Sequence, residues 1–234
     1  NFKYIKLFHN QKNIGLTKSL NLGINLCKGE FIVRQDDDDI SHLNRLLVVN
    51  RILSKNNDLK LISSSFEIIN EKNKIQKTKK ITKQKVLSKH LYKNIISHSS
   101  VVFNKKFIID IGKYNEKFLY TQDYELWNRI IIKNPDLIYF SDKFLVKIRY
   151  HKDSISNTKA LEQRFNSLKV CLASKYHEYY NDIVYADDSN IHKVVAQFEN
   201  RKISNYFYAL KFTYLYEEKF REKLNFQNIF FISK

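Results

Sequence analysis

Strand-like and helix-like patterns alternate along the first 70 residues, and this alternation limits the fold more than any other feature. Residues 4–8, 30–35 and 58–69 are apolar runs with the length and composition of strands. Between the first two, apolar residues recur at helical spacing: Leu16, Leu20, Ile24 and Cys27. Ser41 can cap a second helix over 42–53. Strand, helix, strand and helix in this order predict an α/β domain with neighbouring parallel strands.

The same kind of pattern continues to about residue 157. We expect strands at 99–103, 137–140 and 144–150, and helices at 104–112 and 123–132. After residue 157 only helical spacing remains, so we expect an α/β domain over residues 1–157 and a helical region over 158–234.

The chain carries a large excess of positive charge. It has 41 Lys and Arg residues against 24 Asp and Glu residues, a formal net charge of +17. Nine lysines and one acid lie within residues 71–93, which we call the lysine-rich segment. The excess favours an anionic partner: nucleic acid, acidic lipid headgroups or a phosphorylated substrate. The lysine-rich segment itself is either solvated surface or a binding patch.

Membrane and redox signals in the sequence are sparse. No run reaches the roughly 18 consecutive apolar residues of a spanning helix, and no secretory signal opens the sequence. The two cysteines, Cys27 and Cys171, make no disulfide framework and favour a reducing compartment. We expect a cytoplasmic protein with peripheral contacts at the inner face of the plasma membrane, made by the lysine-rich segment and the aromatic–lysine run 201–220.

Four consecutive aspartates, Asp36 to Asp39, follow the predicted strand at 30–35. Acids at a helix start gain about 0.3–1 kcal/mol each from the helix dipole, which accounts for one or two of the four. A divalent cation accounts for more, because alternate residues of an extended segment point the same way and Asp36 and Asp38 can meet one ion. Mg²⁺ or Mn²⁺ held by so few protein oxygens completes its shell with water and substrate phosphates. The pattern therefore indicates a metal–diphosphate site, with helix capping as the alternative.

An aspartyl-nucleophile phosphatase is a further interpretation, because such enzymes also place an Asp-x-Asp pattern after a strand. The polar pair Arg34 and Gln35 interrupts the apolar strand here, and no later acid pair clearly supplies the remaining machinery. It stays a minor alternative.

Four sequence blocks, in order, resemble the family 2 glycosyltransferases of the GT-A fold. They are "NIGLTKSLNLGINLCKGEFIVRQDDDDIS" (13–41), "HSSVVF" (98–103), "IGKYNEKFLYTQDYELWNRI" (111–130) and "IRYHKDSIS" (148–156). The resemblance implies a Rossmann-related mixed sheet flanked by helices, with a C-terminal helical extension. It also implies an inverting, metal-dependent transfer of one sugar in bacterial surface-polysaccharide synthesis. The donor would be a nucleotide-diphosphate sugar, first of all a UDP-sugar, and the acceptor a glycan or a lipid-linked sugar. No specific nucleic-acid partner is expected.

The resemblance also assigns roles to particular residues. Asp36 and Asp38 match the element that holds Mn²⁺ or Mg²⁺ against the diphosphate, and the neighbouring Asp39 would help to place the sugar. Asp123 matches the general base, on the side opposite the leaving group as inversion requires. His151 would approach the metal or the diphosphate. A second tier of candidates comprises Arg34 for cofactor binding, Gln122, His98 and the fallback base Glu125.

The chain also departs from the family pattern. Family members begin with a strand, a helix and a second strand that are not found before residue 1, and the sequence has no methionine. We therefore expect a domain incomplete at its N-terminus. Leu43 and Ser99 replace two prolines usual in the family. The rival hypothesis is a non-catalytic basic module, a decayed enzyme fragment that binds polyanions or membrane.

Overall fold

A computed structural model describes residues 5–90, 93–151, 154, 158–175 and 180–185. The chain divides into two compact units, residues 1–175 and 176–234. In the second unit the described part is helix α8 (Tyr180–Tyr185), and the aromatic–lysine run 201–220 lies outside the described residues. The first unit carries the sheet and all of the candidate site residues.

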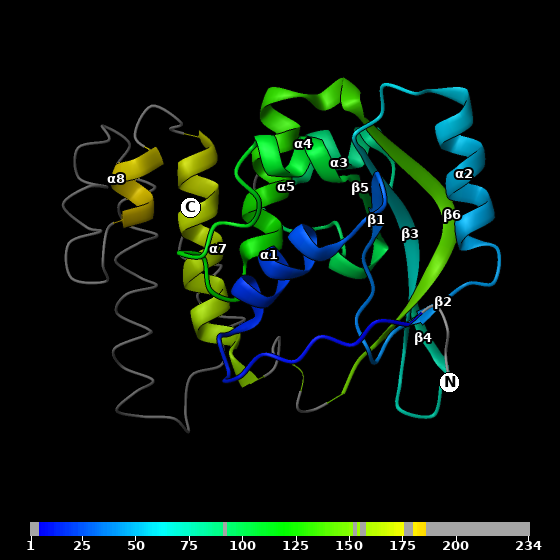
Figure 1. The fold of residues 1–234 in the computed structure, drawn as a ribbon, viewed down its shortest axis with the longest axis horizontal. Coiled ribbons are helices and arrows are strands. Elements are labelled where there is room, and N and C mark those ends of the chain that lie inside the picture. Colours follow the sequence, from blue (N-terminus) through cyan, green and yellow to red (C-terminus); the bar gives the residue numbers. More distant parts are fainter. Residues whose placement is uncertain (1–4, 91–92, 152–153, 155–157, 176–179, 186–234) are drawn as a thin grey trace, which may run out of the picture. The chain divides into compact units, whose positions relative to one another are not determined.

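The centre of the first unit is one mixed, six-stranded sheet (Figure 1). Its strands are β1 (Phe31–Val33), β2 (Ile40–Ser41), β3 (Leu61–Ile69), β4 (Ile75–Lys79), β5 (Val101–Asn104) and β6 (Ile138–Arg149). The strand order is β1-β5-β3-β6-β2, and β4 pairs with β3. The pair β3–β6 is parallel and the other pairs are antiparallel. The α/β class and the mixed sheet expected from the family resemblance are confirmed.

The prediction of neighbouring parallel strands is wrong for β1 and β3. Strand β5 lies between them and is antiparallel to both: Phe103 faces Ile32 on one side and Leu61 on the other. The two strands do run in the same direction, but only as next-nearest neighbours. The pairing was inferred from the local pattern of residues 30–69, which contains no information about β5, because that strand begins some 40 residues after the start of β3.

Several other predicted strands are also changed. Residues 5–8 form no strand: they pair with none of the described strands, and Ile5, Leu7 and Phe8 are exposed. The runs 137–140 and 144–150 join into the single strand β6, whose pairing with β3 shifts register around Ser65.

Six helices accompany the sheet in the described part of the first unit. They are α1 (Leu16–Leu26), α2 (Arg45–Lys55), α3 (Lys83–Lys89), α4 (Lys105–Asp110), α5 (Gln122–Lys133) and α7 (Ala160–Lys175), with 3₁₀ turns η1 (His98–Ser100) and η2 (Pro135–Leu137). Ser41 does not cap α2, because it pairs with Val146 in the sheet, and the helix begins after Asn44. Over the described ranges, no helix is both long and apolar enough to cross a bilayer.

The two faces of the sheet are covered unequally. Leu61, Val101 and Phe103 belong to the larger core, which also contains buried residues of α1, α3, α4 and α5. Their chain neighbours Ile62 and Val102 belong to a smaller core closed by α2. This follows from the alternation of side chains along a strand. Figure 1 shows α2 on one side of the sheet and α1, α4 and α5 on the other.

The aspartate segment, residues 34–39, links opposite edges of the sheet. It leaves β1, at one end of the strand order, and enters β2, at the other end. Its six residues therefore run across the carboxyl ends of the parallel strands, where open α/β sheets bind ligands.

Substitution of two glycines by alanine should change the stability of the fold in opposite directions. Gly112 follows α4 with φ of +91°, whereas Gly23 lies inside α1 and an added Cβ would meet nothing within 4 Å. We predict that Gly112→Ala lowers the free energy of unfolding by about 1–2 kcal/mol, because L-residues disfavour this conformation. Gly23→Ala should raise it by about 0.5–1 kcal/mol. Urea denaturation followed by circular dichroism measures both, and a Gly112→Ala variant as stable as the parent would contradict the geometry.

Candidate active site

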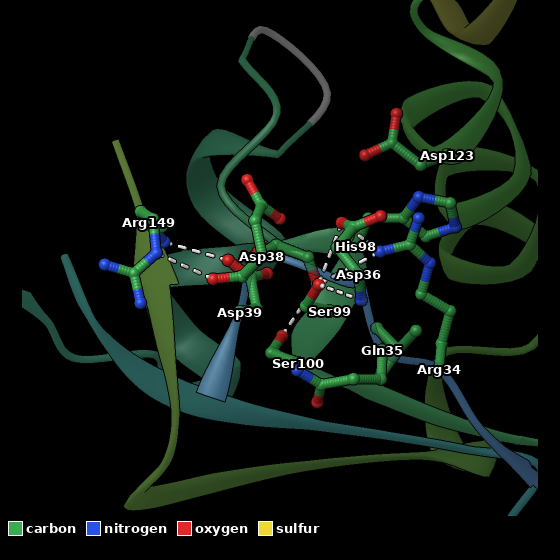
Figure 2. A network of polar contacts seen from close by, with 12 residues as sticks. Arg34, Gln35, Asp36, Asp38, Asp39, His98, Ser99, Ser100, Asp123 and Arg149 are labelled. Atoms are coloured by element: carbon green, nitrogen blue, oxygen red, sulfur yellow. Dashed lines mark hydrogen bonds and ion pairs between the residues drawn. The ribbon is translucent and has the colours of Figure 1, made fainter. Parts of the chain in front are cut away.

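The first half of the aspartate segment is held by a buried serine. The Ser99 hydroxyl donates to Asp36 Oδ2 at 2.9 Å and accepts from the Asp36 backbone N–H at 3.1 Å and from Arg34 Nη1 at 3.0 Å. Arg34 also forms an ion pair with Asp36 (Figure 2). Burial alone would raise the pKa of Asp36, but the hydrogen bond and the charge of Arg34 outweigh it and lower that pKa. Asp36 is therefore an ionised and fixed carboxylate.

A second buried cation lies underneath. The Arg45 side chain is 2% exposed, and its Nη2 donates to the carbonyl oxygens of Arg34 (2.9 Å) and Ser99 (2.7 Å). Its Nη1 donates to Gln35 Oε1 and Ser41 Oγ. Burial lowers the pKa of Arg45 to about 10, so the side chain stays charged at neutral pH. Arg45 thus ties both ends of the aspartate segment to the turn that carries Ser99.

The second half of the segment is fixed by the end of β6. The Arg149 backbone N–H donates to Asp39 Oδ1 at 2.8 Å, and its Nε donates to the Asp38 carbonyl oxygen at 3.0 Å. Burial raises the pKa of Asp39, although the hydrogen bond from the Arg149 backbone N–H opposes this rise. Asp39 therefore acts in the structure as an anchor for Arg149.

Asp38 and His151 form the accessible pair of the site. Asp38 Oδ2 lies 3.1 Å from His151 Nε2, and the two side chains are 37% and 30% exposed. The two residues are 113 positions apart in the sequence, and the structure brings their side chains together. A carboxylate oxygen beside an imidazole nitrogen is a donor set that Mn²⁺ accepts. Among the residues with described positions, no group of three His, Cys, Asp or Glu side chains is arranged to hold an ion.

Asp123 lies in the first turn of α5, which begins after Thr121. One carboxylate oxygen, Oδ2, accepts from Asn94 Nδ2 at 3.0 Å. Burial raises the pKa of Asp123, against the opposing effects of the Tyr124 N–H, of Asn94 and of the Arg34 charge. Arg34 is thus within electrostatic reach of both Asp36 and Asp123, so the candidate base and the aspartate segment surround one cation (Figure 2).

The second-tier candidates have structural surroundings. Glu125 is 2% exposed, and its carboxylate is engaged by Arg129 through contacts of 2.5 and 2.9 Å. His98 contacts the Tyr114 hydroxyl at 2.7 Å, and burial lowers its pKa to about 3, which keeps the ring neutral. Gln122 is buried, and its Oε1 has no hydrogen-bond partner among the described residues.

Arg45, Ser99 and Asn94 help to organise the site, although no local sequence pattern assigns them a role there. Arg45 was counted as part of an amphipathic helix; the available signal was its position one turn before the inward-facing Val49. Ser99 was noted only as a replaced proline. Asn94 binds Asp123 from 29 residues away, and no local pattern marks it.

The sequence of the chain is similar to those of several known proteins. Residues 1–115 match the family model described as "Glycosyl transferase family 2". The chain is 30% identical over 190 residues to the UDP-Gal:alpha-D-GlcNAc-diphosphoundecaprenol beta-1,3-galactosyltransferase of Escherichia coli. The aligned residues cover 78% of this chain and 66% of that protein. It is also 30% identical over 141 residues to the O-antigen biosynthesis glycosyltransferase WbnJ of Escherichia coli, covering 59% of this chain and 55% of the relative. The chain therefore spans only part of the length of these relatives.

Solved structures agree on the fold. The S. aureus TarS 1–349 structure in complex with UDP-GlcNAc superimposes with a TM-score of 0.53 and 12% identity, over 81% of this chain and 53% of that one. The corresponding complex with UDP gives a TM-score of 0.50 and 13% identity, over 80% and 51%. At such identity the likeness establishes the GT-A-like fold and nothing finer. Together, the matched segment, the relatives and the fold show that the chain belongs to glycosyl transferase family 2.

Proposed function

We propose that this chain carries the sugar-transfer site of an inverting glycosyltransferase. It would move one sugar from a nucleotide-diphosphate sugar, a UDP-sugar in the first instance, to a glycan or lipid-linked acceptor. The observation that carries the proposal is the gathering of Asp36, Asp38 and His151 near a separate carboxylate, Asp123, with Arg34 within electrostatic reach of Asp36 and of Asp123.

The donor and acceptor classes are supported by the relatives. The Escherichia coli galactosyltransferase is named for a UDP-sugar donor and a diphosphoundecaprenol-linked acceptor, and TarS was solved with UDP and with UDP-GlcNAc. Family membership leaves the phosphatase interpretation without support.

The donor side would use Asp38 and His151 to hold Mn²⁺ or Mg²⁺. Asp36 can contribute only through Oδ1, because Oδ2 is engaged by Arg34 and Ser99. Two or three protein ligands suit an ion whose remaining ligands are waters and diphosphate oxygens. When bound, the ion would offset the negative charge that the departing diphosphate gains.

The acceptor side would use Asp123 as the general base. Burial moves the pKa of this carboxyl upward, toward the pH at which it must take a proton. Asn94 holds Oδ2, which leaves Oδ1 to accept the proton of the attacking hydroxyl. Asp36 keeps a lowered pKa in contact with Arg34, so the two carboxylates are suited to different tasks.

Donor binding is tested by calorimetric titration of UDP into the chain with Mn²⁺ and with EDTA. We expect binding that requires the metal, and that weakens by about 10–100-fold or more in Asp38→Asn because an ion ligand is lost. Asp37→Asn is the matched control: the Asp37 carboxylate is exposed, so this variant should bind UDP as the parent does. Tight binding that is indifferent to EDTA and to Asp38→Asn would refute the metal assignment.

Asp123→Asn should separate catalysis from folding. Turnover is expected to fall by about 10²–10⁴-fold, while UDP binding is unchanged. Stability should rise at pH 7, because the folded-state pKa lies above the ordinary value of 3.8 and ionisation at neutral pH therefore costs folding free energy. This advantage should shrink with acidification and vanish below about pH 4, where the carboxyl is protonated in both states.

Thermal melts at several pH values, together with a donor-turnover assay, measure both effects. Asp110→Asn, an exposed acid at the end of α4, is the control and should change neither quantity. Full turnover by Asp123→Asn would remove this residue from the mechanism.

A further inference from the structure

The lysine-rich segment is joined to the candidate active site at both of its ends. At its start, Arg149 Nη2 donates to Asn73 Oδ1 at 2.7 Å, while the backbone N–H of the same arginine holds Asp39. Just beyond its end, Asn94 donates to Asp123. One end of the segment is therefore held next to the aspartate segment, and the other end lies next to the candidate base.

Lysines from separate elements of this segment gather on one surface. Lys77 and Lys79 lie two residues apart on β4 and so on the same side of the strand. The pKa of Lys79 is lowered by burial and then by the charges of Lys77, Lys93 and Lys85, which come from β4, from the residue before Asn94 and from α3. These charges all lie within interaction range of Lys79 and form a positive patch around it.

Acids compensate little of this charge. Among the described residues, the segment forms ion pairs with acids at Lys80–Asp142 (3.9 Å) and Lys83–Asp136 (3.0 Å), and all four side chains are more than half exposed. Exposed pairs of this kind contribute little and are screened by salt. Most of the positive charge of the segment is thus available to an external anionic surface.

The other exposed side chains of the patch indicate what kind of anion it meets. Ile75 is 50% exposed and Leu87 is 43% exposed, and both are aliphatic. The sequence of the segment contains a single aromatic residue of the Phe, Tyr and Trp type, Tyr92, whereas surfaces that bind single-stranded nucleic acid stack successive bases on several rings. Cations interspersed with aliphatic side chains suit the headgroup region of a bilayer.

We propose that the described residues of the lysine-rich segment, 71–90 and 93, form a docking surface for an anionic phospholipid bilayer. Docking through this surface would hold the candidate active site at the membrane, next to an acceptor anchored there. The purpose of docking, though not the binding itself, rests on the proposed function with a lipid-linked acceptor.

Vesicle co-sedimentation of the full chain tests the proposal. The parent should bind phosphatidylglycerol-containing vesicles and not pure phosphatidylcholine vesicles, and added salt should weaken the binding. A variant with four exposed lysines of the segment changed to Gln, at Lys74, Lys77, Lys89 and Lys93, should lose on the order of a hundredfold in partitioning. The matched control changes four exposed lysines elsewhere, at Lys12, Lys28, Lys55 and Lys106, and should lose less than about threefold.

The possible outcomes are distinct from those of the UDP titration, because vesicle binding needs neither donor nor acceptor. Both quadruple variants should bind UDP as the parent does, which also shows that they are folded. An equal loss in the two variants, equal binding to neutral vesicles, or tighter binding to RNA than to anionic vesicles would overturn the proposal.

Discussion

The candidate site depends on the buried guanidinium of Arg45. It carries a full positive charge at the base of an acidic segment and donates to the carbonyl oxygens of Arg34 and Ser99 and to two side chains around them. A buried carbonyl that loses its donor costs about 1–3 kcal/mol. The path of the chain from β1 to β2 is therefore fixed from below, before any ligand arrives. On the outer side, the Asp36 carboxylate is bound by Arg34 and Ser99, that of Asp39 by the Arg149 backbone N–H, and that of Asp38 lies beside His151. The Asp37 side chain is exposed to solvent, so the four adjacent carboxylates have different surroundings.

This arrangement gives neighbouring carboxylates different properties. Asp36 is held ionised by Arg34, Asp39 anchors the end of β6, and Asp38 remains accessible beside His151. Burial destabilises the Asp123 carboxylate more than its hydrogen bonds and the charge of Arg34 stabilise it, so its pKa rises. Acid–base roles are commonly divided in this way, by environments that push the pKa values of similar groups apart. The lysine-rich segment contacts residues of both halves of the site and places a cluster of positive charges on the surface beside them.

Local pattern was a good guide to the elements and a poor guide to their pairing. Helical spacing in Leu20 and Ile24 and the apolar run at 58–69 correspond to α1 and β3. The start of α2 was placed too early, because Ser41 has the composition of a helix cap but pairs with Val146 in the sheet. No strand was predicted at β4, which lies in the lysine-rich segment, because its five residues include two lysines and only Ile75 and Thr78 favour a strand. Its pairing with β3, not its propensity, makes it a strand.

The sequence by itself determined the chemistry available to this protein: a run of aspartates after a strand, a distant acid at a helix start and a histidine in the last block. These were readable because each lies within a short pattern whose residue types have a direct chemical meaning. Only the tertiary structure decided the insertion of β5 between β1 and β3, the burial of Arg45 under the aspartates, and the contacts of Ser99 with Asp36 and of Asn94 with Asp123. Those contacts join residues 29 to 63 positions apart, and such partners are selected by packing, which no local period records.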